Sequence, residues 1–143
     1  MRYTVYPRIA GSKRGAQRRL PAEMRIGVRL EGAVAIVVCA GVVNHGDAAR
    51  FAEVFQGLLE SGKHHFVIDF AGLTYIDSTM LAECVAAMRQ AKDRGGNVKL
   101  VSPAGTNVRH ILKITALDRS FDVFDNVREA LEDRAPTREA RRR

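Results

Sequence analysis

The sequence predicts a single α/β domain with a mixed β-sheet and helices packed mainly on one face of that sheet. Two observations support this fold class. The segments 25–30 and 33–40 are adjacent and read as a pair of strands joined by a tight turn. From there to the end, helical and strand patterns alternate, which is typical of strand–helix units with right-handed crossovers. A chain of 143 residues with 46% hydrophobic residues is long enough to bury its own core.

The predicted strands are short apolar runs bounded by turn residues. Residues 25–30 alternate between polar and apolar side chains, as a half-buried strand does. The run 33–40 is apolar throughout and rich in valine, which favours a central strand. Further strands are expected at 65–70, 98–101 and 121–124.

The predicted helices carry apolar residues at spacings of three and four. The first is expected to begin after Asn44, a residue type suited to the N-cap, and to end at Gly62. The second begins at Asp77 or Ser78 and stops at the glycine pair 95–96. A third helix is expected around 108–115 and a short final one at 127–131.

The net charge of +7 is concentrated at the two ends of the chain. Residues 1–25 carry +6 and residues 134–143 carry +4, so residues 26–133 carry −3. We therefore expect a disordered basic extension over 1–23, a folded domain over 24–133 and a disordered Arg-rich tail over 134–143. Met24 is an alternative start, because the folded pattern begins there. Solvated ends are favoured over a specific nucleic-acid interface, which would more often place its charge on a folded face.

The two cysteines, Cys39 and Cys84, lie in apolar runs and are expected to be buried free thiols. Their number and spacing indicate neither a disulfide framework nor a metal site. No apolar run approaches the roughly 20 residues of a membrane-spanning helix. We therefore expect a cytoplasmic protein that does not insert into a membrane.

Enzymatic chemistry is not predicted. The four histidines, at positions 45, 64, 65 and 110, do not pair with acids or thiols at the spacing of a metal site or a catalytic triad. No glycine-rich phosphate cradle is present. We expect no cofactor, no metal and no catalytic residue.

The most informative segment joins the strand that ends near Asp69 to the helix that begins near Asp77 and Ser78. A serine at a helix N-terminus has a structural explanation, because its hydroxyl can cap the helix. It also has a functional one. A phosphate on Ser78 would meet the free N–H groups and the favourable dipole of the helix, so the fold would tolerate it while a docked partner would not.

Asp69, the stretch 76–79 with Leu81, the glycine pair 95–96 and the strand that leads to Pro103 resemble the STAS domain of anti-sigma factor antagonists. The resemblance covers residues 25–133 and implies a STAS-like single domain. It implies that unphosphorylated protein binds an anti-sigma factor serine kinase, that the kinase phosphorylates Ser78, and that a phosphatase reverses this.

The partner-binding residues implied by the resemblance are Asp77, Ser78, Thr79, Met80 and Asn44. The family usually has a glycine where Met80 stands, and acidic residues in the loop that ends at Asn44. The alternative is a structural STAS subunit of a stress-signalling complex or a lipid-transport assembly. In that case Ser78 acts as a helix cap and Met80 as an apolar contact.

Overall fold

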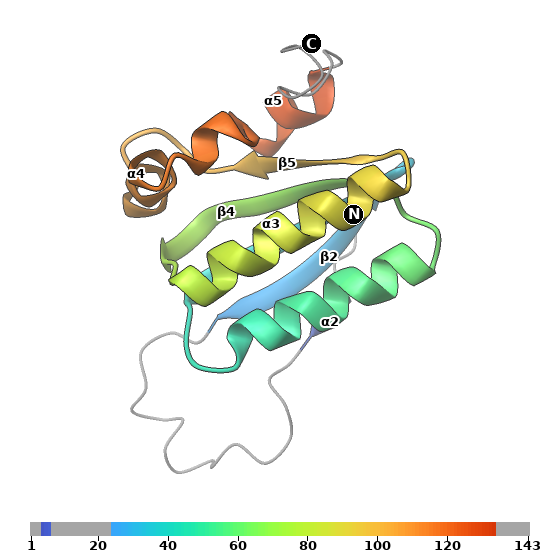
Figure 1. The fold of residues 1–143 in the computed structure, drawn as a ribbon, viewed down its shortest axis with the longest axis horizontal. Coiled ribbons are helices and arrows are strands. Elements are labelled where there is room, and N and C mark those ends of the chain that lie inside the picture. The colour runs from blue at the N-terminus through green and yellow to red at the C-terminus, as the bar shows by residue number, and fades with distance from the viewer. Residues whose placement is uncertain (1–3, 7–23, 134–143) are drawn as a thin grey trace.

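The computed structural model describes residues 4–6 and 24–133, which form a mixed sheet of six strands with helices on both of its faces (Figure 1). The strands lie side by side in chain order. They are β1 (Thr4–Tyr6), β2 (Arg25–Glu31), β3 (Val34–Val42), β4 (His65–Tyr75), β5 (Asn97–Val101) and β6 (Asp122–Phe124). Strand β2 pairs antiparallel with β1 and with β3, whereas β3, β4, β5 and β6 run parallel to one another.

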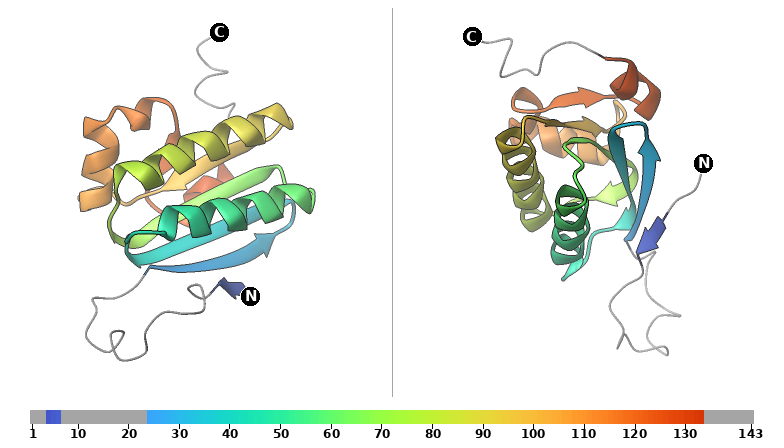
Figure 2. Two further views of the ribbon diagram at one scale, coloured as in Figure 1. Left: turned by 60° about the horizontal axis from the view of Figure 1, so that its bottom comes forward. Right: turned by 90° about the vertical axis from the view of Figure 1, so that its right-hand side faces the viewer.

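Helices connect the parallel strands, as the crossover geometry of parallel strands requires. They are α2 (Asp47–Glu60), α3 (Ser78–Asp93), and α4 (Asn107–Ile114) with the 3-10 turn η1 (Leu117–Arg119). The last helix, α5 (Val127–Glu132), follows β6. Figure 2 shows α2 and α3 lying alongside each other over the same face of the sheet, with α5 on the opposite side. The predicted α/β class, with helices mainly on one face, is confirmed.

The main core lies between the sheet and the layer of α2, α3 and α4. Within this core, Phe55 of α2 packs against Phe66 of β4, and their ring centroids are 4.3 Å apart. Cys39 and Cys84 are buried in this core as free thiols, as predicted. Burial raises the pKa of the Cys84 thiol to about 12, with the nearby Glu83 carboxylate acting in the same direction.

A smaller core lies on the other face of the sheet, beneath α5. Ile36, Val67, Val101 and Ala130 form its buried part. Lys99 of β5 holds the end of α5 in place, because its ammonium group donates a 3.0 Å hydrogen bond to the carbonyl of Ala130. This contact satisfies a carbonyl that the helix itself leaves unpaired at its C-terminus.

Two predictions about the N-terminal part of the domain are wrong. Thr4–Tyr6 form strand β1 beside β2, although 1–23 was expected to be a disordered extension; the rest of that extension, and the tail 134–143, lie outside the described residues. Asn44 does not cap α2, because the N-cap is Gly46. The left-handed backbone of Gly46, with φ of 91°, turns the chain between Asn44 and the helix. The Asp47 carboxylate instead reaches back to accept the Asn44 amide N–H at 2.7 Å.

The parallel register of β3 and β4 brings two loops together at one edge of the sheet. Val42 pairs with Tyr75 near the carboxyl ends of these strands. Asn44 follows two residues after Val42, and Asp77 follows two residues after Tyr75. Because parallel neighbours end at the same edge, the Asn44 loop and the start of α3 lie next to each other. Asn44 and Asp77 are 33 residues apart in the sequence, so local sequence patterns could not predict that they lie close together.

Candidate functional site

The site predicted around Ser78 is built at the point where β4 gives way to α3. Asp77 is the N-cap of α3, and its Oδ1 accepts a 2.8 Å hydrogen bond from the amide N–H of Met80. The amide of Leu81 then donates to the Asp77 carbonyl at 3.0 Å and begins the helical pattern. Of the two predicted caps, Asp77 therefore takes this role, and Ser78 becomes the first residue of the helix.

Burial alternates sharply through this turn. Ile76 and Met80 are buried in the main core, whereas Ser78 and Thr79 are exposed between them. The two buried side chains anchor the turn on both sides, so the exposed hydroxyls are presented at a defined position. Asp77 is half-buried, because its carboxylate turns back onto the helix.

The prediction that Met80 contacts a partner is wrong. Its side chain is 0% exposed and lies in the main core. On α3, Met80 lies on the same side as Cys84 and Ala87, which face the sheet. A bulky side chain at this position therefore fills the interior rather than narrowing the approach to Ser78. Of the five predicted partner-binding residues, Asn44, Ser78 and Thr79 are exposed and lie at one edge of the molecule.

Two hydrogen bonds tie the segment before Ser78 to its neighbours. The Thr74 hydroxyl donates to the carbonyl of Gly41 at 3.2 Å, and the Asn107 side-chain amide donates to the Thr74 carbonyl at 3.3 Å. Strands β3 and β4 also approach closely at Gly72, where an added Cβ would lie only 3.0 Å from the Ala40 Cβ. The site is thus connected to β3 and α4, and no local sequence pattern indicated either connection.

The loop at Asn44 is held by a buried ion pair that the sequence analysis also missed. Asp47 is fully buried, and its Oδ1 lies 3.0 Å from Nη1 of Arg50. Arg50 also donates to the carbonyl of Met24 at 3.1 Å. The sequence pattern that could have predicted this ion pair is the three-residue spacing of Asp47 and Arg50 on one helix. These contacts fix the position of Asn44 relative to the start of β2.

Asp69, part of the same motif, does not join this site. Phe70 and its neighbour Ile68 point into the main core, so Asp69 between them faces the opposite side of the sheet. Burial raises the pKa of its carboxyl group, while the N–H of Ala71 at 2.9 Å and the charge of Arg29 act in the opposite direction. The hydrogen bond from Ala71 to Asp69 lies where the pairing of β4 with β3 shifts register.

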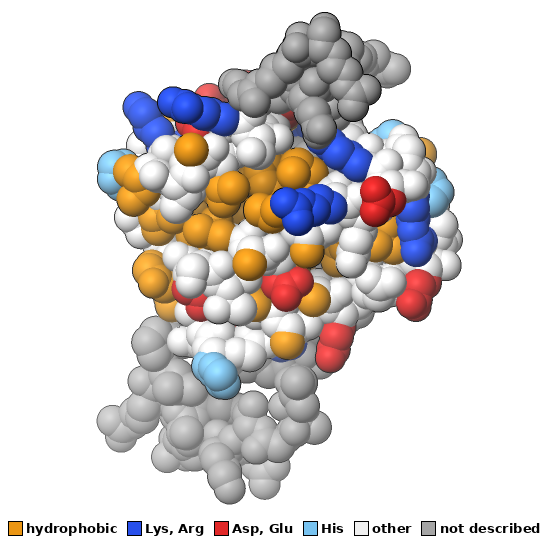
Figure 3. Space-filling view, viewed as in Figure 1, with side chains coloured by type: hydrophobic (Ala, Val, Ile, Leu, Met, Phe, Trp, Pro, Cys, Tyr) orange, Lys and Arg blue, Asp and Glu red, His pale blue; other side chains and the backbone are white. Residues whose placement is uncertain are grey.

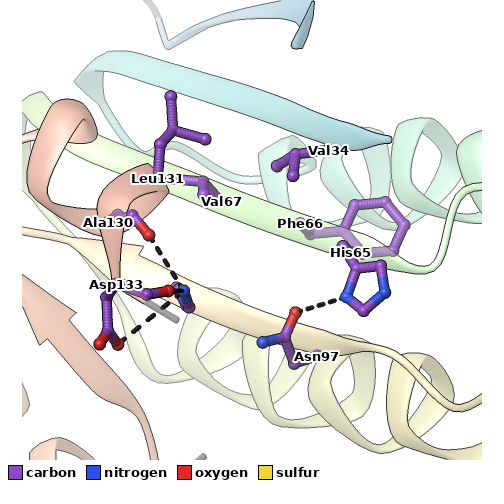
Figure 4. A pocket seen from close by; sticks show the side chains of 9 residues that line it. Val34, His65, Phe66, Val67, Asn97, Ala130, Leu131 and Asp133 are labelled. Carbon is purple, nitrogen blue, oxygen red and sulfur yellow. Dashed lines mark hydrogen bonds and ion pairs between the residues drawn. The ribbon is translucent and has the colours of Figure 1, made fainter. Parts of the chain in front are cut away.

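Two hollows on the described surface are not lined by Ser78. One, of about 390 Å³, lies between α5 and the sheet, where His65 Nδ1 is 3.0 Å from Asn97 Oδ1 and Lys99 is held against α5 (Figure 4). The other, of about 730 Å³, lies beside the start of α4 and is lined by Arg109, His110 and Lys113 among others. Over the described part of the chain, no cluster of three or more His, Cys, Asp or Glu side chains is arranged to hold a metal ion. Within residues 4–6 and 24–133, no helix is long and apolar enough to cross a membrane.

Comparison with known proteins identifies the family of this fold. The sequence pattern of the STAS domain matches residues 25–130. A candidate anti-sigma factor antagonist of Thermotoga neapolitana is 34% identical over 80 residues, which are 56% of this chain and 70% of that protein.

Solved structures agree with this match. An anti-sigma factor antagonist from Mycobacterium paratuberculosis superposes with a TM-score of 0.68 at 18% identity, over 76% of this chain and 91% of that one. Unphosphorylated SpoIIAA, also an anti-sigma factor antagonist, superposes with a TM-score of 0.64 at 16% identity, over 75% and 93%. The phosphorylated form of SpoIIAA, from Bacillus, gives 0.60 at 15% identity, over 75% and 96%.

Proposed function

The chain belongs to the STAS domain family, among the anti-sigma factor antagonists, and we propose that it acts by switching partners through phosphorylation of Ser78. Unphosphorylated protein binds an anti-sigma factor serine kinase and so frees a sigma factor for transcription. The kinase phosphorylates Ser78 and is released, and a phosphatase restores the unmodified form. The domain works as a binding module and carries out no reaction itself.

The observation that carries this proposal is the separation of roles within the turn. Asp77 caps α3, while Ile76 and Met80 anchor the turn in the core. The exposed Ser78 hydroxyl is therefore not needed to start the helix. A group attached to Ser78 points to solvent and leaves the caps and the core unchanged.

The position of Ser78 also suits a negative charge. A phosphoserine adds about −1.5 to −2 charge and three strong acceptors. Ser78 is the first residue of a 16-residue helix, where free N–H groups and the helix dipole favour an anion. Asp77 adds local repulsion, but its Oδ1 is occupied by the Met80 amide. The penalty of phosphorylation then falls mainly on a partner that packs against this turn.

The neighbouring loops define the face that the kinase would contact. Thr79 and Asn44 are exposed beside Ser78, at the edge where β3 and β4 end. SpoIIAA has the same fold and has been solved in both unphosphorylated and phosphorylated forms. In that protein the fold accommodates the modification, which supports the corresponding behaviour here.

The experiment is affinity capture with the full chain, followed by mass spectrometry of the bound proteins. Wild type, Ser78→Ala and Ser78→Asp are compared, with Ser61→Asp as the matched control because Ser61 is exposed at the far end of α2. We expect wild type, Ser78→Ala and the control to retain an ATP-dependent anti-sigma kinase. Ser78→Asp is expected to bind at least about 100-fold more weakly, because a full switch needs several kcal/mol of differential affinity.

Incubation of the captured kinase with ATP provides the second measurement. Phosphate is expected on wild type and on Ser61→Asp, and not on Ser78→Ala. If all four proteins retain the same partners and no kinase is among them, partner switching is refuted. The chain is then a structural STAS subunit of a larger assembly.

A further inference from the structure

Apolar side chains gather on the outer surface between α3 and α4. We call this surface the α3–α4 strip, and it consists of Val85, Met88, Ile111, Ile114 and Leu117. Ile114 is 67% exposed, and the other four are partly buried against the main core. Figure 3 shows apolar side chains over this region, with a Lys or Arg side chain lying across them.

The strip is open because no described helix covers it. Helix α3 packs against α2 and β5, whereas α4 packs against β4 and η1. The two helices thus pack mainly on different neighbours, and the side chains between them stay partly exposed, with Ile114 exposed most. A contiguous apolar surface with a charged border is typical of a protein-binding site.

The charge of this region differs in sign from that of the domain. Residues 26–133 contain 11 Lys and Arg against 14 Asp and Glu, a net charge of −3. The segments 78–93 and 107–119, which form the strip and its border, carry +2. Arg89 and Lys92 are four and seven residues after Val85, so they lie on its side of α3. Arg109 and Lys113 lie on the side of α4 away from Ile111, where Arg109 pairs with Asp125 at 3.5 Å. The border thus complements an acidic partner.

The α3–α4 strip begins close to Ser78, at the start of α3. Ser78, Ala82 and Val85 are spaced by four and three residues, so they follow one side of α3. Seven residues of helix span about 10 Å. A helix of three or four turns that lay on the strip would therefore reach Ser78 at one end.

We propose that the α3–α4 strip binds an acidic amphipathic helix of the anti-sigma partner, an inference that rests on the proposed function. The apolar side of that helix packs on Val85, Met88 and Ile114, and its acidic side meets the cations of the border. A phosphate on Ser78 then stands against a helix that is itself negatively charged. This repulsion supplies the differential affinity that releases the partner.

The first test does not depend on finding the kinase. The ¹⁵N-labelled full chain is titrated with a synthetic 15-residue acidic amphipathic helix, and separately with the same peptide in which every acid is replaced by lysine. We expect the acidic peptide to shift the amide signals of Val85, Met88, Ile111 and Ile114, and the lysine peptide not to do so. Shifts at other surfaces, equal shifts with both peptides, or none with either would overturn the inference.

Matched variants locate the contact. Ile114→Glu is paired with Leu30→Glu, since Leu30 is an apolar side chain 52% exposed on β2. Arg89→Glu is paired with Arg128→Glu on α5, on the other face of the sheet. The strip variants are expected to weaken acidic-peptide binding about tenfold or more, and the controls less than about twofold. Circular dichroism confirms that each variant is folded.

The same variants separate this inference from the proposed function. If the captured kinase is lost by Ser78→Asp but retained by both Ile114→Glu and Arg89→Glu, the switch stands and the strip is not its contact. If no kinase is captured while the acidic peptide binds the strip, the proposed function fails, and the strip is retained only as a binding site for an acidic helix. Broadening of the strip signals with protein concentration, without peptide, would assign the strip to self-association and overturn the inference.

Discussion

The carboxylate of Asp77 accepts the amide N–H of Met80 at 2.8 Å, across the intervening residues Ser78 and Thr79. One of the two residues bridged by this bond caps the helix, and the other is buried in the core. The hydroxyls between them are left exposed. The helix cap and the exposed hydroxyls are thus supplied by different side chains of the same turn, so each can be changed separately.

Loss of the cap should destabilise the domain. Asp77→Ala removes the acceptor for the Met80 amide and is expected to lower the free energy of unfolding by about 1 kcal/mol, within a range of about 0.5 to 2. Asp77→Asn retains an acceptor and should recover most of that loss. Urea unfolding at neutral pH measures both. Thr79→Ala, at an exposed position, is the control, and an equal loss in Thr79→Ala would mean that the cap is not the cause.

Met80 should behave as a core residue. Met80→Ala removes most of a side chain that is 0% exposed, and is expected to cost about 2 to 5 kcal/mol because a cavity remains. Met80→Leu keeps the volume and should cost less than about 1.5 kcal/mol. Chemical denaturation of both variants checks this. A neutral effect of Met80→Ala would place the side chain at the surface, as the sequence alone had suggested.

Asp69 should make stability depend on pH in acid solution. Its folded-state pKa lies above the ordinary 3.8, so its neutral form is favoured in the folded protein. Stability from this group is therefore fully present below the ordinary pKa and is lost as pH rises through the raised pKa. Asp69→Asn, which keeps an acceptor for the Ala71 amide, should be at least as stable as wild type at neutral pH.

The measurement is urea unfolding of both proteins across this acid range. The difference in unfolding free energy, variant minus wild type, should grow as the pH rises from below 3.8 to neutral. A difference that shrinks over the same range would indicate that the charged form of Asp69 is the one stabilised, through Arg29.

The two thiols should be unreactive in the folded protein. Cys39 and Cys84 are buried, and the pKa of the Cys84 thiol lies at about 12, so little thiolate is present at neutral pH. We expect no labelling by iodoacetamide in buffer within the time in which both thiols react fully in denaturant. Intact-mass spectrometry counts the adducts, and rapid labelling of native protein would contradict the burial of this part of the core.

Much of the fold could be predicted from the sequence because its signals are local. The alternation in 25–30, the apolar run of 33–40 and the helical spacing after Ser78 depend on a few neighbouring residues. The same local chemistry placed Asp77 and Ser78 at the start of a helix, and α3 begins at Ser78. Two adjacent residues were each able to cap it, and the sequence left that choice open.

Only the tertiary structure decided which side chains are available to a partner. The burial of Met80 follows from the way α3 packs on the sheet. The placement of Asn44 near Ser78 follows from the pairing of Val42 with Tyr75, and Asp69 faces the other side of the sheet from Ile68 and Phe70. The exposure of Ile114 likewise depends on where α4 packs on the sheet. Local sequence patterns determine helices and strands, whereas contacts between residues distant in the chain determine what is exposed, because burial is a property of the packed whole.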